Sequence, residues 1–141
     1  MSLFQSEYEV KVPFEDLDPM NVVWHGNYMR YMEQARCDML SKLKYNYNNM
    51  RHDGYFYPIA KMDVKYIKSA TFEDILVIKT ELISIEPAIN IKYSISNKQT
   101  GEKIFEGSTM QIGIDMNTKE SLYVPPQGLV DAVKGVSNEK I

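Results

Sequence analysis

The fold is decided by residues 26–45, which read GNYMRYMEQARCDMLSKLKY. Apolar side chains in this stretch recur at steps of three and four residues, which is the spacing of one helix face. They are Tyr28, Met29, Met32, Ala35, Met39, Leu40 and Leu43. The opposite face carries Arg30, Glu33, Gln34, Asp38 and Lys42. We therefore expect one long amphipathic helix, and we expect the Asn-rich run 46–54 to end it and to turn the chain at Gly54.

Alternation of polar and apolar residues predicts strands on both sides of this helix. One strand is expected before it at residues 7–13, and four are expected after it. The first three of these cover residues 61–66, 76–85 and 89–96. In the last strand the residues expected to share a face are Met110, Ile112 and Ile114. The row in 76–85 slips phase at Ile83, as a bulge would cause, and a short helical turn is expected at 129–133.

This order of elements predicts an α+β fold, because consecutive strands joined by short links pair antiparallel. A five-stranded antiparallel sheet presents one apolar face on which a single long helix can be buried. The 141 residues contain no repeat and no linker, and their number is that of one ordinary domain. We therefore expect one domain over residues 1–141.

Composition excludes several classes of protein. A net charge of −3 gives no basic footprint for a nucleic-acid partner. Cys37 is the only cysteine, so no intrachain disulfide can form, and a cytoplasmic protein is expected. No run of about 18 apolar residues is present, and the first residues lack the pattern of a secretory signal, so we expect neither a membrane span nor a leader.

Several familiar chemistries have no support in the sequence. It contains no Gly-x-Ser-x-Gly motif, no Gly-rich phosphate loop and no dinucleotide fingerprint. His25, His52 and Cys37 are too few for a zinc site, so we expect no metal and no resident cofactor. Cys37 falls in the middle of the predicted helix, away from the first turn that would lower its pKa. A small packed side chain is favoured there over a nucleophile.

Asp18 stands before Pro19, about eight residues ahead of the predicted helix start. The first N–H groups of a helix lack internal partners and carry about half a positive charge, so they can receive an oxyanion. A carboxylate beside them could attack a thioester carbonyl or activate water. Spacing alone, however, favours a turn-forming role for Asp18. An ordinary role near the helix start is also favoured for His25, and ordinary structural roles are open to Asn27, Glu33, Tyr66 and Lys68.

Residues 10–36 resemble the signature region of a known family. They read VKVPFEDLDPMNVVWHGNYMRYMEQAR, and their pattern is similar to that of hotdog acyl-CoA thioesterases related to 4-hydroxybenzoyl-CoA thioesterase. In that family an Asp-x-Asp turn, a Val-Val-aromatic-His segment and an Asn-Tyr pair lead into the central helix. The likeness continues through residues 64–70 and 74–81. It implies the hotdog fold, in which a five-stranded antiparallel sheet wraps around one long helix.

The resemblance assigns site residues one by one. It places the catalytic carboxylate on Asp18 and the carbonyl-polarising backbone amide on His25, whose side chain varies in role between branches. The positions implied to shape the site or contact substrate are Trp24, Asn27, Tyr28, Glu33, Tyr66 and Lys68. One departure is Met20-Asn21, where the family often has glycine in the turn. Asn tolerates left-handed backbone, so the turn is expected to survive.

The resemblance also implies function and partners. The expected reaction is hydrolysis of an acyl-CoA thioester to a free acid, with coenzyme A as part of the substrate. An acyl-carrier-protein thioesterase and a catalytically silent acyl-binding module remain alternatives, whereas the Asp-x-Asp turn argues against a dehydratase. A homodimer or homotetramer with sites between subunits is implied. The cations proposed for coenzyme A phosphates are Lys61, Lys65, Lys68 and Arg51.

Overall fold

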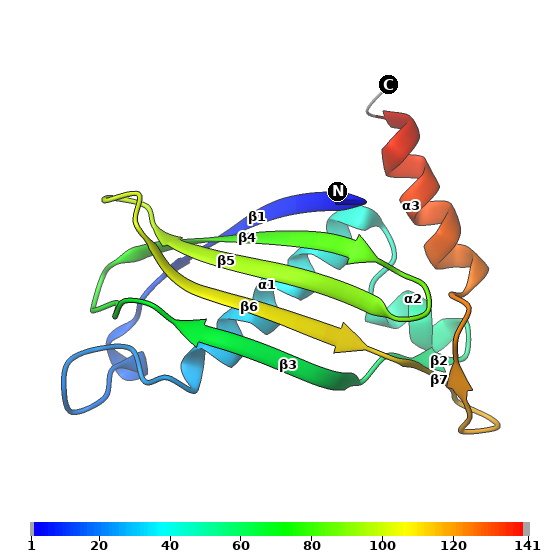
Figure 1. The fold of residues 1–141 in the computed structure, drawn as a ribbon, viewed down its shortest axis with the longest axis horizontal. Helices are drawn as coiled ribbons and strands as arrows, with labels where there is room; N and C mark the ends of the chain where they lie inside the picture. Colours follow the sequence, from blue (N-terminus) through cyan, green and yellow to red (C-terminus); the bar gives the residue numbers. More distant parts are fainter. Residues whose placement is uncertain (1, 140–141) are drawn as a thin grey trace.

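A computed structural model of the protein describes residues 2–139 (Figure 1). Its three α-helices are α1 (Asn27–Leu43), α2 (Tyr47–His52) and α3 (Gln127–Glu139). Its strands are β1 (Phe4–Lys11), β2 (Tyr55–Phe56), β3 (Ile59–Tyr66), β4 (Ile75–Ser84), β5 (Ile89–Asn97), β6 (Lys103–Gln111), β7 (Gly113–Asp115) and β8 (Ser121–Leu122). A short 3-10 turn, Phe14–Asp16, follows β1.

The main sheet has five antiparallel strands in the order β1-β4-β5-β6-β3. It curves around α1, which crosses one of its faces (Figure 1). This confirms the predicted five-stranded sheet around one long helix. The register between β4 and β5 shifts between Leu82 and Ser84, which confirms the bulge expected there. Gly54 takes a φ of 95°, as expected of the residue that turns the chain after the Asn-rich run.

The apolar stripe of α1 is buried against the sheet. The buried helix residues are Tyr28, Tyr31, Met32, Ala35, Arg36, Met39, Leu40 and Leu43. Each large apolar side chain removed from water in this way contributes about 1.5–3 kcal/mol. Close approach of helix and sheet depends on Gly107 of β6, because a Cβ there would lie 2.8 Å from the sulfur of Met32. The periodicity of the sequence thus predicts which helix face is buried, and the missing side chain at Gly107 leaves space for Met32 of that face.

Strand β3 differs from the other strands of the main sheet. It is an edge strand, and its alternating residues Met62, Val64 and Tyr66 are 37–47% exposed. These residues pair with Thr109, Gly107 and Phe105 of β6, so they share the sheet face that carries α1. The helix does not cover this edge, and an apolar row remains open to solvent.

The predicted last strand is wrong at its end. The ladder of β6 stops at Gln111, and Ile114 belongs to β7 in a separate three-stranded sheet, β2-β7-β8. Met110, Ile112 and Ile114 therefore do not form one row of a single strand, and all three are only partly buried. The chain leaves the main sheet next to Gly113, where the ring of Tyr57 occupies the space of a side chain. The alternation of polar and apolar residues continues through this point, so it does not show that the chain pairs with a different strand after Gln111.

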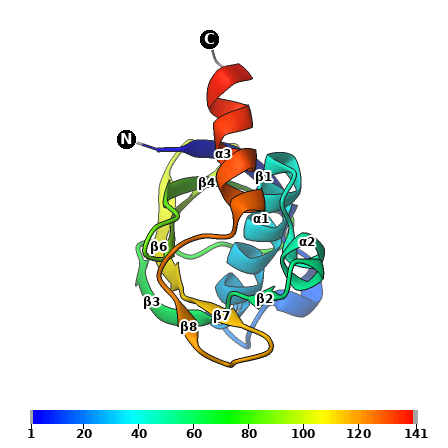
Figure 2. The same cartoon turned by 90° about the vertical axis from the view of Figure 1, so that its right-hand side faces the viewer.

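Two helices were not predicted at their full extent. The Asn-rich run was expected to end α1, but α1 ends earlier, at Leu43, where Lys44 takes left-handed backbone with a φ of 70°. The run begins α2 instead, because the Asn46 side chain accepts hydrogen bonds from the N–H groups of Asn48 and Asn49. Helix α3 is longer than the turn expected at 129–133. The side chains of Leu129 and Val133, in its first half, are buried, whereas its far end projects from the body of the protein (Figure 2). None of the helices among residues 2–139 is long and apolar enough to cross a bilayer.

Candidate active site

The loop between β1 and α1 is a tight, doubly anchored turn. The N–H of Asp18 donates to Val22 O at 2.9 Å, and the N–H of Asn21 donates to Asp18 O at 3.0 Å. Asn21 has a φ of 62°, so it takes left-handed backbone, which its short polar side chain tolerates. Val23 ties the loop to the main body through its N–H, which donates to Ala70 O at 2.8 Å. The turn survives Met20-Asn21, as expected.

Asp18 faces a cavity of about 280 Å³ at the start of α1. One carboxylate oxygen accepts a hydrogen bond from the N–H of Met20 at 2.8 Å. The turn-forming role and the chemical role are therefore compatible, because the turn uses one oxygen only. The cavity is lined by Asp18, Met20, Val22, Val23, His25, Tyr28, Tyr66, Ile67, Lys68 and Ser69.

The N-terminus of α1 lies beside this cavity. The N–H of Asn27 donates to Trp24 O, and the N–H of Met29 donates to Gly26 O. By contrast, within residues 2–139 the N–H groups of His25 and Gly26 have no hydrogen-bond acceptor. Free amides at a helix start, with the helix dipole behind them, form an anion-stabilising position. A carboxylate and a potential oxyanion site are thus adjacent.

Asp16 has a different role from Asp18. Its side chain is buried, with the residue 4% exposed, and it binds two groups of α1. Arg30 forms an ion pair with one carboxylate oxygen, and Tyr31 donates to the other at 2.6 Å. Burial alone would raise the pKa of this carboxyl, but the hydrogen bonds from Arg30 and Tyr31 and the charge of Arg30 outweigh it and lower the pKa. Asp16 therefore anchors the loop to the helix.

Aromatic rings form the inner wall of the cavity. The phenol of Tyr66 donates to His25 O at 2.9 Å, and its ring meets Tyr28 edge-on at 5.6 Å between centroids. Tyr28 stacks on Phe105 at 4.9 Å, and burial raises the pKa of its phenol. Trp24 does not line the cavity but lies against His25 at the helix start, half exposed.

The remaining candidate residues lie in different places. Lys68 lines the cavity and forms an ion pair with Glu102 of the β5–β6 turn. Asn27 points to the loop instead, where its side-chain amide donates to Asp16 O at 2.9 Å. Glu33 lines a separate shallow depression on the open face of α1. Its role as a substrate contact remains a prediction.

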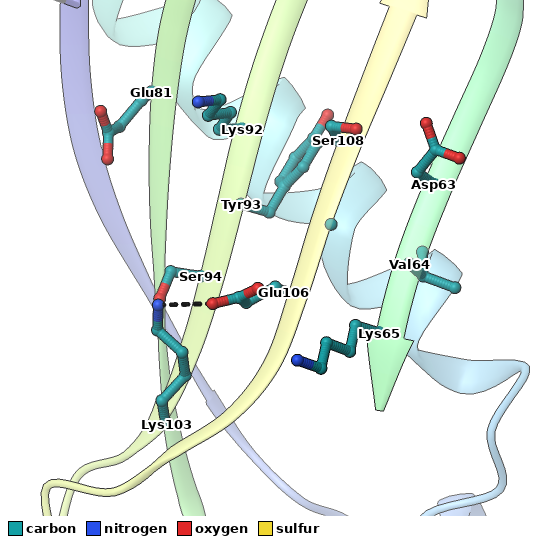
Figure 3. A pocket seen from close by; sticks show the side chains of 11 residues that line it. Asp63, Val64, Lys65, Glu81, Lys92, Tyr93, Ser94, Lys103, Glu106 and Ser108 are labelled. Carbon is teal, nitrogen blue, oxygen red and sulfur yellow. Dashed lines mark hydrogen bonds and ion pairs between the residues drawn. The ribbon is translucent and has the colours of Figure 1, made fainter. Parts of the chain in front are cut away.

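The proposed phosphate-binding lysines are not brought together. Lys61 and Lys65 lie along β3 on the outer sheet face, away from α1, and Arg51 lies on α2. Figure 3 shows the depression on that outer face, where Lys65, Lys92 and Lys103 alternate with Asp63, Glu81 and Glu106. Lys103 pairs with Glu106 at 2.8 Å. This mixture of signs is a poor phosphate site. Among residues 2–139 no three His, Cys, Asp or Glu side chains are grouped to hold a metal ion.

Sequence reasoning missed the contribution of Asp16, Arg30 and Tyr31. A signal was present, since Asp16 stands two residues before Asp18, but Arg30 falls on the polar face of the predicted helix. The anchoring role of Asp16 nevertheless required its contacts, because the motif does not show that its side chain is buried against Arg30 and Tyr31.

The sequence profile described as "Thioesterase-like superfamily" matches residues 12–133. A DHNA-CoA thioesterase from Staphylococcus aureus has 30% identity and a TM-score of 0.80, over 97% of this chain and 95% of that one. A 1,4-dihydroxy-2-naphthoyl-CoA thioesterase from Synechocystis has 18% identity and a TM-score of 0.84, over 92% and 96%. The acyl-CoA thioester hydrolase YbgC of Escherichia coli is 32% identical over 78 residues, 55% of this chain and 58% of that protein.

A curved five-stranded antiparallel sheet around one long helix defines the hotdog class of proteins, and the structural likenesses confirm that fold. Within this class the chain belongs to the thioesterase-like superfamily, whose profile covers most of its length.

Proposed function

We propose that the protein is a hydrolase that cleaves acyl-CoA thioesters. The observation that carries the proposal is the cavity lined by both Asp18 and His25, whose amide is free at the helix start. A carboxylate that serves as base or nucleophile and an oxyanion position are the two groups that support acyl transfer to water. Relatives named as acyl-CoA thioesterases support the same reaction.

Asp18 acts on the thioester carbonyl as a general base or as a nucleophile. As a base it takes one proton from water while the water oxygen bonds to the carbonyl carbon. The carbonyl oxygen becomes an oxyanion that accepts a hydrogen bond from the amide of His25. When the carbon–sulfur bond breaks, its electron pair leaves on sulfur, and the proton held by Asp18 passes to the thiolate. The products are a carboxylic acid and a thiol.

Coenzyme A is the preferred carrier in this proposal, and acyl carrier protein is the alternative. Lys68 is the cavity cation that could meet an anionic carrier, although Glu102 now pairs with it. Measuring hydrolysis of the same acyl groups on both carriers separates these alternatives. A higher kcat/KM on coenzyme A supports the first.

A homodimer formed through the edge of β3 also belongs to this proposal. The unpaired edge carries the exposed apolar residues Met62, Val64 and Tyr66, and Tyr66 continues into the cavity. Pairing with a second copy would satisfy the open backbone groups and cover the apolar row. Light scattering on the wild type should give a dimer or a tetramer, and Val64→Lys should shift it toward monomer. A monomeric wild type would contradict this part.

The central test is a panel of short, long and aromatic acyl thioesters with thiol release as the readout. Wild type should release thiol, and Asp18→Ala should not. Asp131→Asn is a matched control, because Asp131 is an exposed aspartate on α3, outside both the cavity lining and β3. Lack of Asp18-dependent release across the panel would remove the enzyme assignment and favour an acyl-binding module.

A further inference from the structure

The peptide group between His25 and Gly26 is held at its carbonyl end by a side chain from another element. His25 precedes Gly26, the N-cap of α1, so its carbonyl lies outside the hydrogen bonds of the helix. The N–H of Met29 donates to Gly26 O at 3.2 Å, and His25 O accepts from the phenol of Tyr66 at 2.9 Å. Tyr66 thus supplies from β3 the hydrogen bond that the helix does not make.

This contact acts on the opposite end of the same peptide. A donor on the carbonyl oxygen polarises the peptide group, and hydrogen bonds in series strengthen one another by roughly 10–30% each. The N–H of that peptide belongs to Gly26 and has no acceptor within residues 2–139. The Tyr66 phenol therefore makes the Gly26 N–H a stronger and better-fixed donor.

The Trp24 indole holds the other side of the peptide. A Cβ on Gly26 would lie 2.8 Å from Cε3 of Trp24 and still closer to other atoms of its six-membered ring. Gly26 has an ordinary φ of −68°, so its glycine is required for space and not for backbone conformation. The indole lies directly on Gly26 and against the ring of His25, with 5.0 Å between the ring centroids.

We propose that Tyr66 is a positioning residue for catalysis, which acts by fixing the His25–Gly26 peptide, with Trp24 packed on Gly26 as the second support. This proposal rests on the proposed thioesterase function. It assigns the Tyr66 hydroxyl to the protein backbone and not to the substrate. It also adds the Gly26 amide to that of His25 as an oxyanion donor.

The first test is Tyr66→Phe, which removes the hydroxyl and keeps the ring packed on Tyr28. We expect kcat to fall on the order of tenfold with KM nearly unchanged, because only a donor used in the transition state is weakened. Tyr123→Phe is the control, since Tyr123 is an exposed tyrosine near β8. An unchanged kcat, or a loss confined to KM, would overturn the proposal.

The second test needs no activity. Glycine labelled with ¹⁵N gives few amide signals, since the chain has seven glycines, and Gly26→Ala identifies that of Gly26. In Tyr66→Phe the Gly26 amide proton should move upfield, while the signals of Gly54 and Gly101 stay in place. A Gly26 signal that does not move overturns the inference. If the wild type hydrolyses no thioester, the proposed function fails separately.

A double-mutant cycle tests the second support. Gly26→Ala alone should displace the indole, shift the fluorescence of Trp24, the only tryptophan, and lower kcat. In a Trp24→Ala background the same change meets no indole, so its additional effect on kcat should be smaller. Equal effects of Gly26→Ala in both backgrounds would contradict a supporting role for Trp24.

Discussion

Asp16 and Asp18 lie two residues apart in one turn, but their carboxylates meet opposite environments. Asp16 is buried and binds Arg30 and Tyr31 of α1, whereas Asp18 faces the cavity and gives one oxygen to the N–H of Met20. The backbone of Asp16 is also fully used, because its carbonyl accepts from Trp24 and Asn27. One aspartate thus fixes the loop on the helix, and the other remains available for chemistry. The difference predicts that the first governs stability and the second governs rate.

The largest expected effect is that of Asp18→Asn on rate. Removing a general base typically costs 10²–10⁴ in rate, so we expect kcat to fall by about 10³. The free energy of unfolding should change by less than about 1 kcal/mol, because the new amide oxygen still accepts from Met20. Thiol release and urea unfolding measure the two quantities. An Asp18→Asn variant with normal kcat would contradict the catalytic role of Asp18.

Asp16→Asn should mainly lower stability. Its amide cannot replace a carboxylate between Arg30 and Tyr31, and loss of a buried, charge-assisted contact costs about 2–3 kcal/mol. Urea unfolding should show this as a lower midpoint with an unchanged slope. Asp131→Asn serves as control, because that aspartate is exposed on α3. If Asp16→Asn unfolds at the same urea concentration as the control and the wild type, Asp16 does not stabilise the fold as proposed.

Tyr31→Phe isolates one contact of Asp16. The ring stays buried, but one oxygen of Asp16 loses its donor, so we expect a loss of about 1 kcal/mol in the free energy of unfolding. In the Asp16→Asn background the same substitution should cost less, since the two residues share the contact. Fully additive losses would show that Tyr31 stabilises the fold independently of Asp16.

Acidification should bring the wild type and Asp16→Asn closer together. The pKa of Asp16 in the folded protein lies below its ordinary value of 3.8, so its contribution to stability is complete above that value. The contribution is lost as the pH falls through the lower pKa of the folded state. The difference in unfolding free energy between the two proteins should therefore narrow below about pH 4. A difference that stays constant into this range would contradict the ion pair with Arg30.

Much of the framework was predictable because it depends on local periodicity. The stripe of α1 and the alternation in β4 and β5 repeat at helix and strand spacing, so their burial follows from the sequence. Prediction failed where the structure of a segment depends on contacts that its periodicity does not show. Ile114 alternates like a continuing strand, but the chain leaves the main sheet near Gly113, and the Asn-rich run becomes α2 through its own capping contacts.

The candidate site divides in the same way. The motif was enough to single out Asp18 and the helix start, and Asn21 could be expected to take left-handed backbone because its short side chain tolerates it. The bond from Tyr66 to His25 O could not be foreseen, since the two residues are 41 positions apart. Nor could Lys68 be placed beside Glu102 before the β5–β6 turn was known.

The sequence alone thus determined the elements, their main buried faces and the segment in which an acid precedes a helix start. Those properties depend on spacing of a few residues, which the backbone geometry of helices and strands converts directly into faces. Only the tertiary structure decided which aspartate is buried, which amides are free and which distant side chains hold them. These outcomes depend on contacts between separate elements, where burial and hydrogen bonding give two similar carboxylates different roles.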